Sequence, residues 1–191
     1  MHPDDSLFAL FDDLEQQASG LHLAEREAEV EELAVAEYAQ VTLVERLHGA
    51  RGSPVRLRLV DGDLLSGTLR RVGRDWLQVD DPHGCSWLVR IGAVAAVSGL
   101  GSRAVNEDAL PVTARLSLRS ALRALAQARG HCVLHLVGGD RVEGVPGRVG
   151  QDFVEILPAD PATDRVAGRR THGPAVEVVP LWGLVALRER R

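Results

Sequence analysis

Lysine is absent from this sequence of 191 residues, and all 22 basic residues are arginine. The arginine bias has two interpretations. It is typical of a genome with high GC content, and it would also arise from selection for bidentate guanidinium contacts to phosphate. Cysteine is scarce as well. Cys85 and Cys132 are too few for a disulfide framework, although one bond between them remains compatible with the sequence.

Aromatic residues make up 4% of the chain, and no apolar run is long enough to span a bilayer. The N-terminus has no signal-peptide pattern. We therefore expect a bacterial, cytoplasmic protein that makes no membrane contact. The 45% hydrophobic content, mostly Val, Leu and Ala, is enough to bury a core and argues against global disorder.

The net charge of −5 hides an asymmetry between the two ends of the chain. Residues 1–50 contain 12 acidic residues and 2 arginines, whereas residues 51–191 contain 15 acidic residues and 20 arginines. Such an acidic arm could screen a nucleic-acid surface on the same chain or bind a basic partner. It could equally be the solvated face of a helix.

Residues 1–50 are predicted to be this acidic helical arm. A first short helix is indicated by Ser6 in a capping position and by four apolar residues at helical spacing. These are Leu7, Leu10, Phe11 and Leu14. They are candidates for docking a protein partner, or they fold back onto the chain itself. A second, longer helix is predicted from Leu23 to His48, ended by Gly49 and Gly52.

An internal repeat organises the rest of the sequence. Residues 55–79 align without gaps with residues 132–156, and ten of the 25 positions are identical. The identical pairs are Leu57/Leu134, Leu59/Leu136, Val60/Val137, Gly62/Gly139, Asp63/Asp140, Gly67/Gly144, Arg71/Arg148, Val72/Val149, Gly73/Gly150 and Asp75/Asp152. The matched Gly and Asp residues lie where turns and bends require them.

Each copy of the repeat predicts five short strands after a helix. Apolar and polar residues alternate from Val55 to Leu59, an Asp-Gly turn follows, and Gly67 marks a bend in a long second strand. We expect a first barrel at 51–100, a linker and helix at 101–130, and a second barrel at 131–191. The helix is predicted to begin after Ser117 and to run to Arg129.

The pattern LVDGDLLSGTLRRV after a helix resembles the Sm-like fold, a small barrel whose outline is shared by SH3-like barrels. In that family a Gly in the first turn is followed five residues later by a Gly that bends the second strand, and Gly62/Gly67 and Gly139/Gly144 match this spacing. The resemblance implies a mainly β chain with two tandem five-stranded barrels. It also implies RNA binding in oligomeric rings. The position of the family's RNA-binding Asn falls at or near Trp76 and Phe153, so this Asn is missing from both units, and Ile91 separates Arg90 from Gly92.

The candidate nucleic-acid residues are arginines and one tryptophan, since guanidinium groups bind phosphate and an indole stacks on bases. They are Arg56, Arg58, Arg70, Trp76, Arg90, Arg119 and Arg123. The alternative is that the arginines face water beside aspartates and that Trp76 belongs to the core, as its counterpart Phe153 suggests.

The Cys and His residues are too scattered for a compact metal site, and no nucleophile elbow, phosphate loop or HExxH motif is present. We therefore expect no enzyme, no cofactor and no metal. The predicted function is a non-enzymatic binding or scaffold protein acting through protein contacts and self-association. The alternative is an RNA- or DNA-binding regulator that uses the arginine-rich face of the first barrel.

Overall fold

A computed structural model of the chain describes residues 32–106, 109–110, 112–158 and 176–189. The chain divides into two compact units, residues 1–42 and 43–191. Among the described residues, all strands belong to the second of these units. The predicted docking residues Leu7, Leu10, Phe11 and Leu14 lie outside the described part of the chain.

The helix predicted from Leu23 to His48 is interrupted within its described part. Residues 32–38 are helical, a turn follows, and a separate helix, α2, spans Leu43–Gly49. The prediction of one continuous helix was wrong. The sequence around the break explains it: Val41 and Thr42 are β-branched, and Thr42 with Glu45 has the spacing of a capping box, which starts a new helix.

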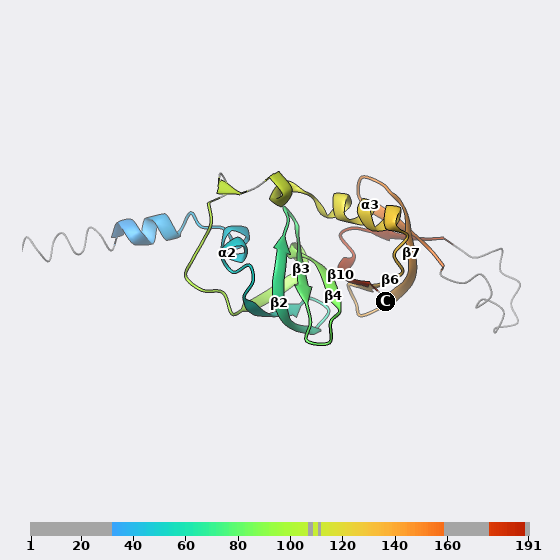
Figure 1. The fold of residues 1–191 in the computed structure, drawn as a ribbon, viewed down its shortest axis with the longest axis horizontal. Helices are drawn as coiled ribbons and strands as arrows, with labels where there is room; N and C mark the ends of the chain where they lie inside the picture. Colours follow the sequence, from blue (N-terminus) through green and yellow to red (C-terminus); the bar gives the residue numbers. More distant parts are fainter. Residues whose placement is uncertain (1–31, 107–108, 111, 159–175, 190–191) are drawn as a thin grey trace, which may run out of the picture. The chain divides into compact units, whose positions relative to one another are not determined.

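The first β unit follows α2. Its strands are β1 (Pro54–Leu59), β2 (Leu64–Val72), β3 (Trp76–Asp80), β4 (Ser86–Arg90) and β5 (Val94–Ser98), with a 3-10 turn, η1 (Ile91–Ala93), before β5. Buried and exposed residues alternate along β1, as the sequence predicts for a strand with one face in a core. Helix α2 packs against β2 (Figure 1).

A short 3-10 turn, η3 (Val112–Arg115), and helix α3 (Leu118–Ala128) connect the two β units. The predicted helix is confirmed, with Ser117 at its N-cap and Arg129 in the left-handed conformation at its C-cap. The second β unit contains β6 (Cys132–Leu136), β7 (Arg141–Val149), β8 (Phe153–Leu157), β9 (Glu177–Pro180) and β10 (Leu184–Glu189). Helix α3 packs against β7 (Figure 1).

The repeat in the sequence is also a repeat in hydrogen bonding. The amide of Leu59 donates to the carbonyl of Asp63 at 2.9 Å, and the amide of Leu136 donates to that of Asp140 at the same distance. The amides of Ile91 and Leu181 donate in the same way to the carbonyls of Asp75 and Asp152. In both units the register shifts two residues after the matched glycine, in β2 after Leu69 and in β7 after Pro146.

The ten strands form a single antiparallel sheet in the order β5-β1-β2-β3-β4-β10-β6-β7-β8-β9. The mainly β class is therefore confirmed. The two predicted barrels do not stand as separate closed sheets, because β10 pairs with β4 of the first unit as well as with β6 of its own unit. Within the described residues, β5 and β9 are the two open edges of this sheet.

Each hydrophobic core includes residues from the other β unit. The core of the first β unit contains Val185 and Ala186 from β10, and the core of the second β unit contains Trp76 from β3. The two β units therefore share buried surface as well as strand pairing.

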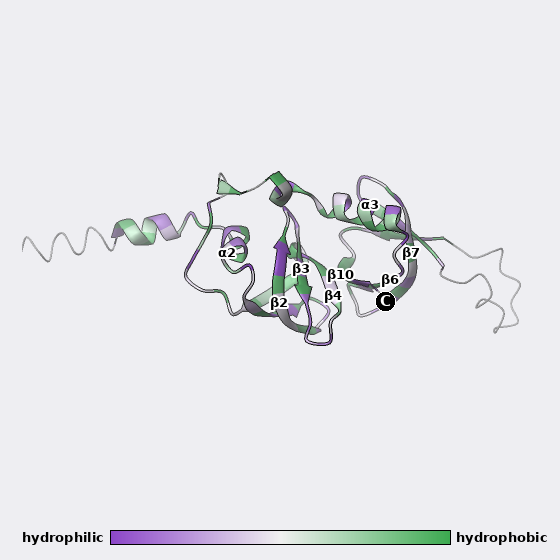
Figure 2. Ribbon diagram, viewed as in Figure 1, coloured by the Kyte–Doolittle hydropathy of each residue, from purple (hydrophilic) through white to green (hydrophobic). Residues whose placement is uncertain are grey.

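Figure 2 shows that the sheet also has hydrophilic parts. The arrowhead end of β2 is coloured hydrophilic, where Arg70 and Arg71 are exposed.

Among the described residues, no helix combines the length and the apolar character that a membrane span requires.

Candidate functional site at the junction of the two β units

The junction between the β units is a strand pair. In β10, Ala186, Leu187 and Arg188 lie opposite Val89, Leu88 and Trp87 of β4. By the repeat, β10 is the fifth strand of its unit and β4 is the fourth strand of the other. The fourth strand of one β unit thus pairs with the fifth strand of the other. This pairing covers one edge of each strand that would otherwise be open to other partners.

Arg90, at the end of β4, reinforces this strand pair with its side chain. Its Nε donates to the carbonyl of Leu184 at 2.7 Å and its Nη2 donates to the carbonyl of Trp182 at 3.0 Å. Burial lowers the pKa of Arg90, and the carboxylate of Asp75 partly opposes this shift. The guanidinium of Arg90, which the sequence predicts to bind nucleic acid, is therefore hydrogen-bonded to the backbone of the second β unit.

Helix α3 is also tied to the first unit. The side chain of Ser117 makes no capping hydrogen bond, and instead the Oδ1 of Asp75 accepts the amide of Leu118 at 2.6 Å. A carboxylate at a helix N-terminus satisfies an unpaired amide and interacts favourably with the helix dipole. Asp75, which the repeat places in a turn, therefore also caps a helix across the junction, 43 residues later in the sequence.

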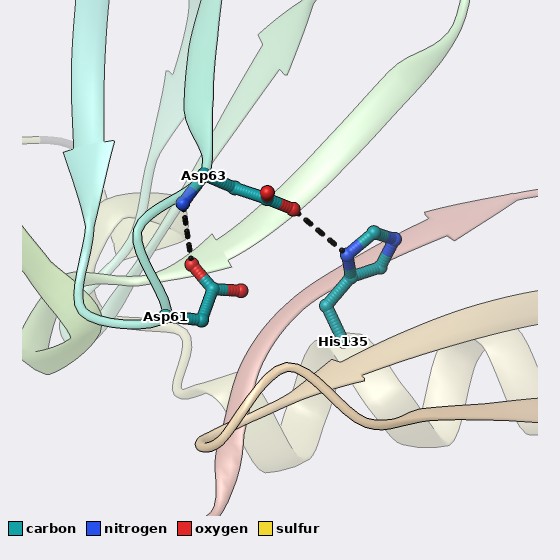
Figure 3. Close-up of side chains that lie close together, drawn as sticks. All are labelled: Asp61, Asp63 and His135. Atoms are coloured by element: carbon teal, nitrogen blue, oxygen red, sulfur yellow. Dashed lines mark hydrogen bonds and ion pairs between the residues drawn. The ribbon is translucent and has the colours of Figure 1, made fainter.

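A polar cluster closes the other end of the junction. Asp61 and Asp63 lie in the turn between β1 and β2, and His135 comes from β6 of the second unit (Figure 3). The amide of Asp63 donates to the Oδ1 of Asp61 at 3.1 Å, and the Oδ2 of Asp63 lies 3.5 Å from the Nδ1 of His135. One ligand atom from each of the three side chains lies within 4.8 Å of the other two.

The imidazole of His135 is held in a buried, oriented position. Its side chain is only 7% exposed, and the ring meets that of Trp87 edge-on at 5.1 Å between centroids. The guanidinium of Arg188 lies 5.5 Å from the centre of the Trp87 ring. Burial lowers the pKa of His135, as does the charge of Arg141, and the two aspartates partly oppose this. The net shift favours the neutral form of the ring.

The other predicted nucleic-acid residues fall into two groups. Arg56 and Arg58 are exposed on β1 and Arg123 is exposed on α3, where Arg119 is half-buried. Trp76 is only 8% exposed, and its Nε1 donates to the carbonyl of Leu116 at 2.9 Å. The structure therefore supports the core interpretation of Trp76.

Arg70 is exposed but has an acidic neighbour. Its Nε lies 2.8 Å from the Oδ2 of Asp80. Hydrogen bonds from Ser86 and Arg70 hold the pKa of Asp80 below its usual value. Arg70 also borders a cavity of about 450 Å³ between α2 and β2, together with Arg51 and Arg103. The sequence alone did not indicate that these three arginines lie around one cavity.

The two cysteines are both free, Cys85 half-buried and Cys132 buried. Burial, assisted by the charge of Glu189, raises the pKa of the Cys132 thiol to about 12.

Comparison with protein-family models found no match for this chain, and comparison with curated proteins found no match either.

Within the repeat, the departure of one residue from its counterpart is a sequence signal for the polar cluster. The spacing of Cys and His residues alone could not reveal the cluster. His135 occupies the position of Arg58, and Asp63 is matched by Asp140. Asp61 and His135 are far apart in the sequence, so their meeting depends on the β4–β10 pairing. A search for Cys and His at short spacing could not bring these residues together.

Proposed function

We propose that this protein is a non-enzymatic scaffold that self-associates through its sheet edges, and that its β units are two divergent Sm-like barrels. The observation that carries the proposal is the β4–β10 pairing. The chain uses one fourth-strand edge and one fifth-strand edge internally. The edges that remain open among the described strands, β5 and β9, are a fifth and a fourth strand. A second copy can therefore repeat the same pairing between chains.

The exposed residues of β9 support this assembly. Val178 occupies the position of Leu88, which is packed against the core at the internal junction, yet Val178 is 59% exposed. Trp182, directly after β9, is 72% exposed. Large apolar side chains at an open strand edge are typical of a protein contact surface. In the assembly, Val178 would lie opposite Val97 of the next copy.

The charges at the proposed contact are complementary. At the internal junction Asp63 faces His135. At the junction between copies the repeat replaces these two residues with Asp140 and Arg58, which are both exposed. A carboxylate would therefore face a guanidinium across the new interface. This arrangement favours association and sets its register, since charged pairs suppress wrong alignments.

The proposed contact is heterologous, because it joins two different edges. Repeated contacts of this kind produce a closed ring when the rotation closes and a filament when it does not. Pro180 takes the place of Arg90 at this contact, so the two side-chain hydrogen bonds of the internal junction have no counterpart. The contact between copies is therefore weaker than the contact within the chain.

Light scattering coupled to size-exclusion chromatography tests the proposal. We expect the mass of the full chain to be a multiple of 20.6 kDa and to depend on concentration. Arg58→Glu and Asp140→Arg should each weaken association by at least about tenfold, and the double variant should restore it. Arg123→Glu, an exposed charge reversal on α3, is the matched control. A monomer at all concentrations, or single variants identical to the control, would refute the proposal.

A nucleic-acid-binding regulator is the second candidate, favoured by the basic cavity. Arg51, Arg70 and Arg103 surround it, and Arg56 borders a neighbouring hollow of about 430 Å³. Clustered guanidinium groups bind phosphates, and such binding weakens steeply with salt. If this candidate holds, Arg51→Ala with Arg103→Ala should reduce binding of a single-stranded oligonucleotide at low salt, while Arg148→Ala, at an exposed arginine of β7 that borders neither hollow, leaves it unchanged. No binding by the unmodified chain at low salt would eliminate it.

A further inference from the structure

The cluster of Asp61, Asp63 and His135 brings together ligand atoms of two kinds from two parts of the chain. The carboxylates come from the β1–β2 turn of the first β unit, and the imidazole comes from β6 of the second. Figure 3 shows the Asp63 carboxylate and the His135 ring pointing toward one another, with Asp61 in the same turn. This arrangement raises the question of what neutralises two carboxylates beside a buried ring.

We propose that Asp61, Asp63 and His135 bind a divalent transition-metal cation of the Zn²⁺ class, which clamps the two β units together. The proposal does not depend on self-association, because all three ligands belong to one chain. A nitrogen and two oxygens suit a borderline ion such as Zn²⁺, whereas Mg²⁺ and Ca²⁺ prefer oxygen alone. With three protein ligands, a water molecule completes a tetrahedral site.

The distances fit such an ion. In a tetrahedral site with ligand bonds of about 2.1 Å, neighbouring ligand atoms are about 3.4 Å apart. The Nδ1 of His135 and the Oδ2 of Asp63 are 3.5 Å apart, and all three ligand atoms lie within 4.8 Å of one another. In the metal-bound form we expect the Asp61 and Asp63 side chains to rotate toward the ion. Asp63 is 54% exposed, so its carboxylate has room to move.

His135 provides an observation independent of the acidic pair. Its side chain is 93% buried and turned toward the two carboxylates, and the Trp87 ring fixes its orientation. The Nδ1 of His135 and the Oδ2 of Asp63 are 3.5 Å apart. This distance is longer than a charge-assisted hydrogen bond, which measures about 2.7–2.9 Å. A buried imidazole whose Nδ1 faces the carboxylate of Asp63, with Asp61 in the same turn, is a suitable nitrogen ligand beside two oxygen ligands.

The repeat makes the site specific to the internal junction. At the equivalent positions of the proposed contact between copies, Asp61, Asp63 and His135 are replaced by Gly138, Asp140 and Arg58. A guanidinium is not a ligand for a cation, and Gly138 offers no side chain. The full chain is therefore expected to bind one equivalent at this site whether or not it associates.

Isothermal titration of the EDTA-treated full chain with Zn²⁺ alone tests the inference, with Mg²⁺ as the second probe. We expect a Zn²⁺ site that Mg²⁺ does not occupy, and a higher melting temperature in Zn²⁺. Asp63→Asn should weaken this site at least about tenfold and remove most of the melting shift. This variant keeps the shape of an exposed side chain, so its fold, checked by circular dichroism, should survive. His83→Ala, an exposed histidine outside the cluster, is the matched control and should bind as the unmodified chain does.

Substitution with Co²⁺ supplies a second readout that a purely structural role of Asp63 would not change. We expect visible d–d absorption bands typical of a nitrogen- and oxygen-ligated ion, lost in Asp63→Asn and retained in His83→Ala. The inference is overturned if Zn²⁺ gives no binding heat at 100 µM or so, well above typical affinities of protein zinc sites. It is equally overturned if Asp63→Asn binds and melts like the control, because the ion would then lie elsewhere.

Discussion

Replacing the bend glycines tests whether the two β units are built in the same way. A Cβ atom on Gly67 would overlap the carbonyl oxygen of Asp80 and lie 2.7 Å from Cγ1 of Val79. On Gly144 it would overlap the carbonyl oxygen of Leu157 and lie 2.7 Å from a methyl carbon of Ile156. In both units the obstacle is the backbone of the next strand, which cannot rotate aside as a side chain can.

The size of the effect follows from these contacts. Overpacking costs about 1–3 kcal/mol in general, and a clash with paired backbone places both glycines at the upper end of that range. Alanine also restricts the unfolded chain, which returns about 0.4–1 kcal/mol. We therefore expect Gly67→Ala and Gly144→Ala each to lower the free energy of unfolding by about 2 kcal/mol.

Urea denaturation followed by circular dichroism measures both variants, with the slope checking that the same surface is exposed. Gly101→Ala is the control, since a Cβ there meets no atom within 4 Å. It should change the free energy of unfolding by less than about 0.5 kcal/mol. If Gly67→Ala proves as stable as Gly101→Ala, the close approach of β2 and β3 is not what requires glycine at the bend.

Three further predictions concern buried polar groups. Burial, with the charge of Arg51, lowers the pKa of His48, so its contribution to stability is fully present above the unfolded value of about 6.5 and is lost as pH falls below it. The difference between the urea midpoints at pH 7.5 and 5.5 should shrink in His48→Leu without vanishing, because the pKa of His135 is also lowered, and an unchanged difference would contradict this. With its raised pKa, Cys132 should resist iodoacetamide at pH 8 while half-buried Cys85 reacts, as mass spectrometry of the folded chain can show. Arg90→Met leaves two carbonyls without their donors and should cost about 2–4 kcal/mol in urea denaturation, whereas a loss under 0.5 kcal/mol or so would disprove its role at the junction.

Much of the local structure could be predicted from the sequence because its causes are local. Alternation from Val55 to Leu59 predicts β1, and Ser117 predicts the start of α3. The continuous helix from Leu23 to His48 was the main local error. Its Ala- and Glu-rich composition outweighed the capping pattern at Thr42, which begins α2.

The candidate site was only partly accessible to sequence analysis. Arg90 was selected for its charge, but its direction depends on the carbonyls of Trp182 and Leu184, about ninety residues later. Trp76 matched both a stacking residue and a core residue, and only the shared second core decided between them. Asp61 and His135 gave no joint signal, because their proximity arises from folding.

By itself the sequence determined the repeat, the bends at Gly67 and Gly144, and the strand and helix types, since alternation and turn chemistry act over a few residues. The tertiary structure decided that β10 pairs with β4, so that one open sheet replaces two separate barrels. Backbone hydrogen bonding is the same for every strand and does not by itself select a partner. The choice of partner depends on which edges and apolar faces meet in the folded chain.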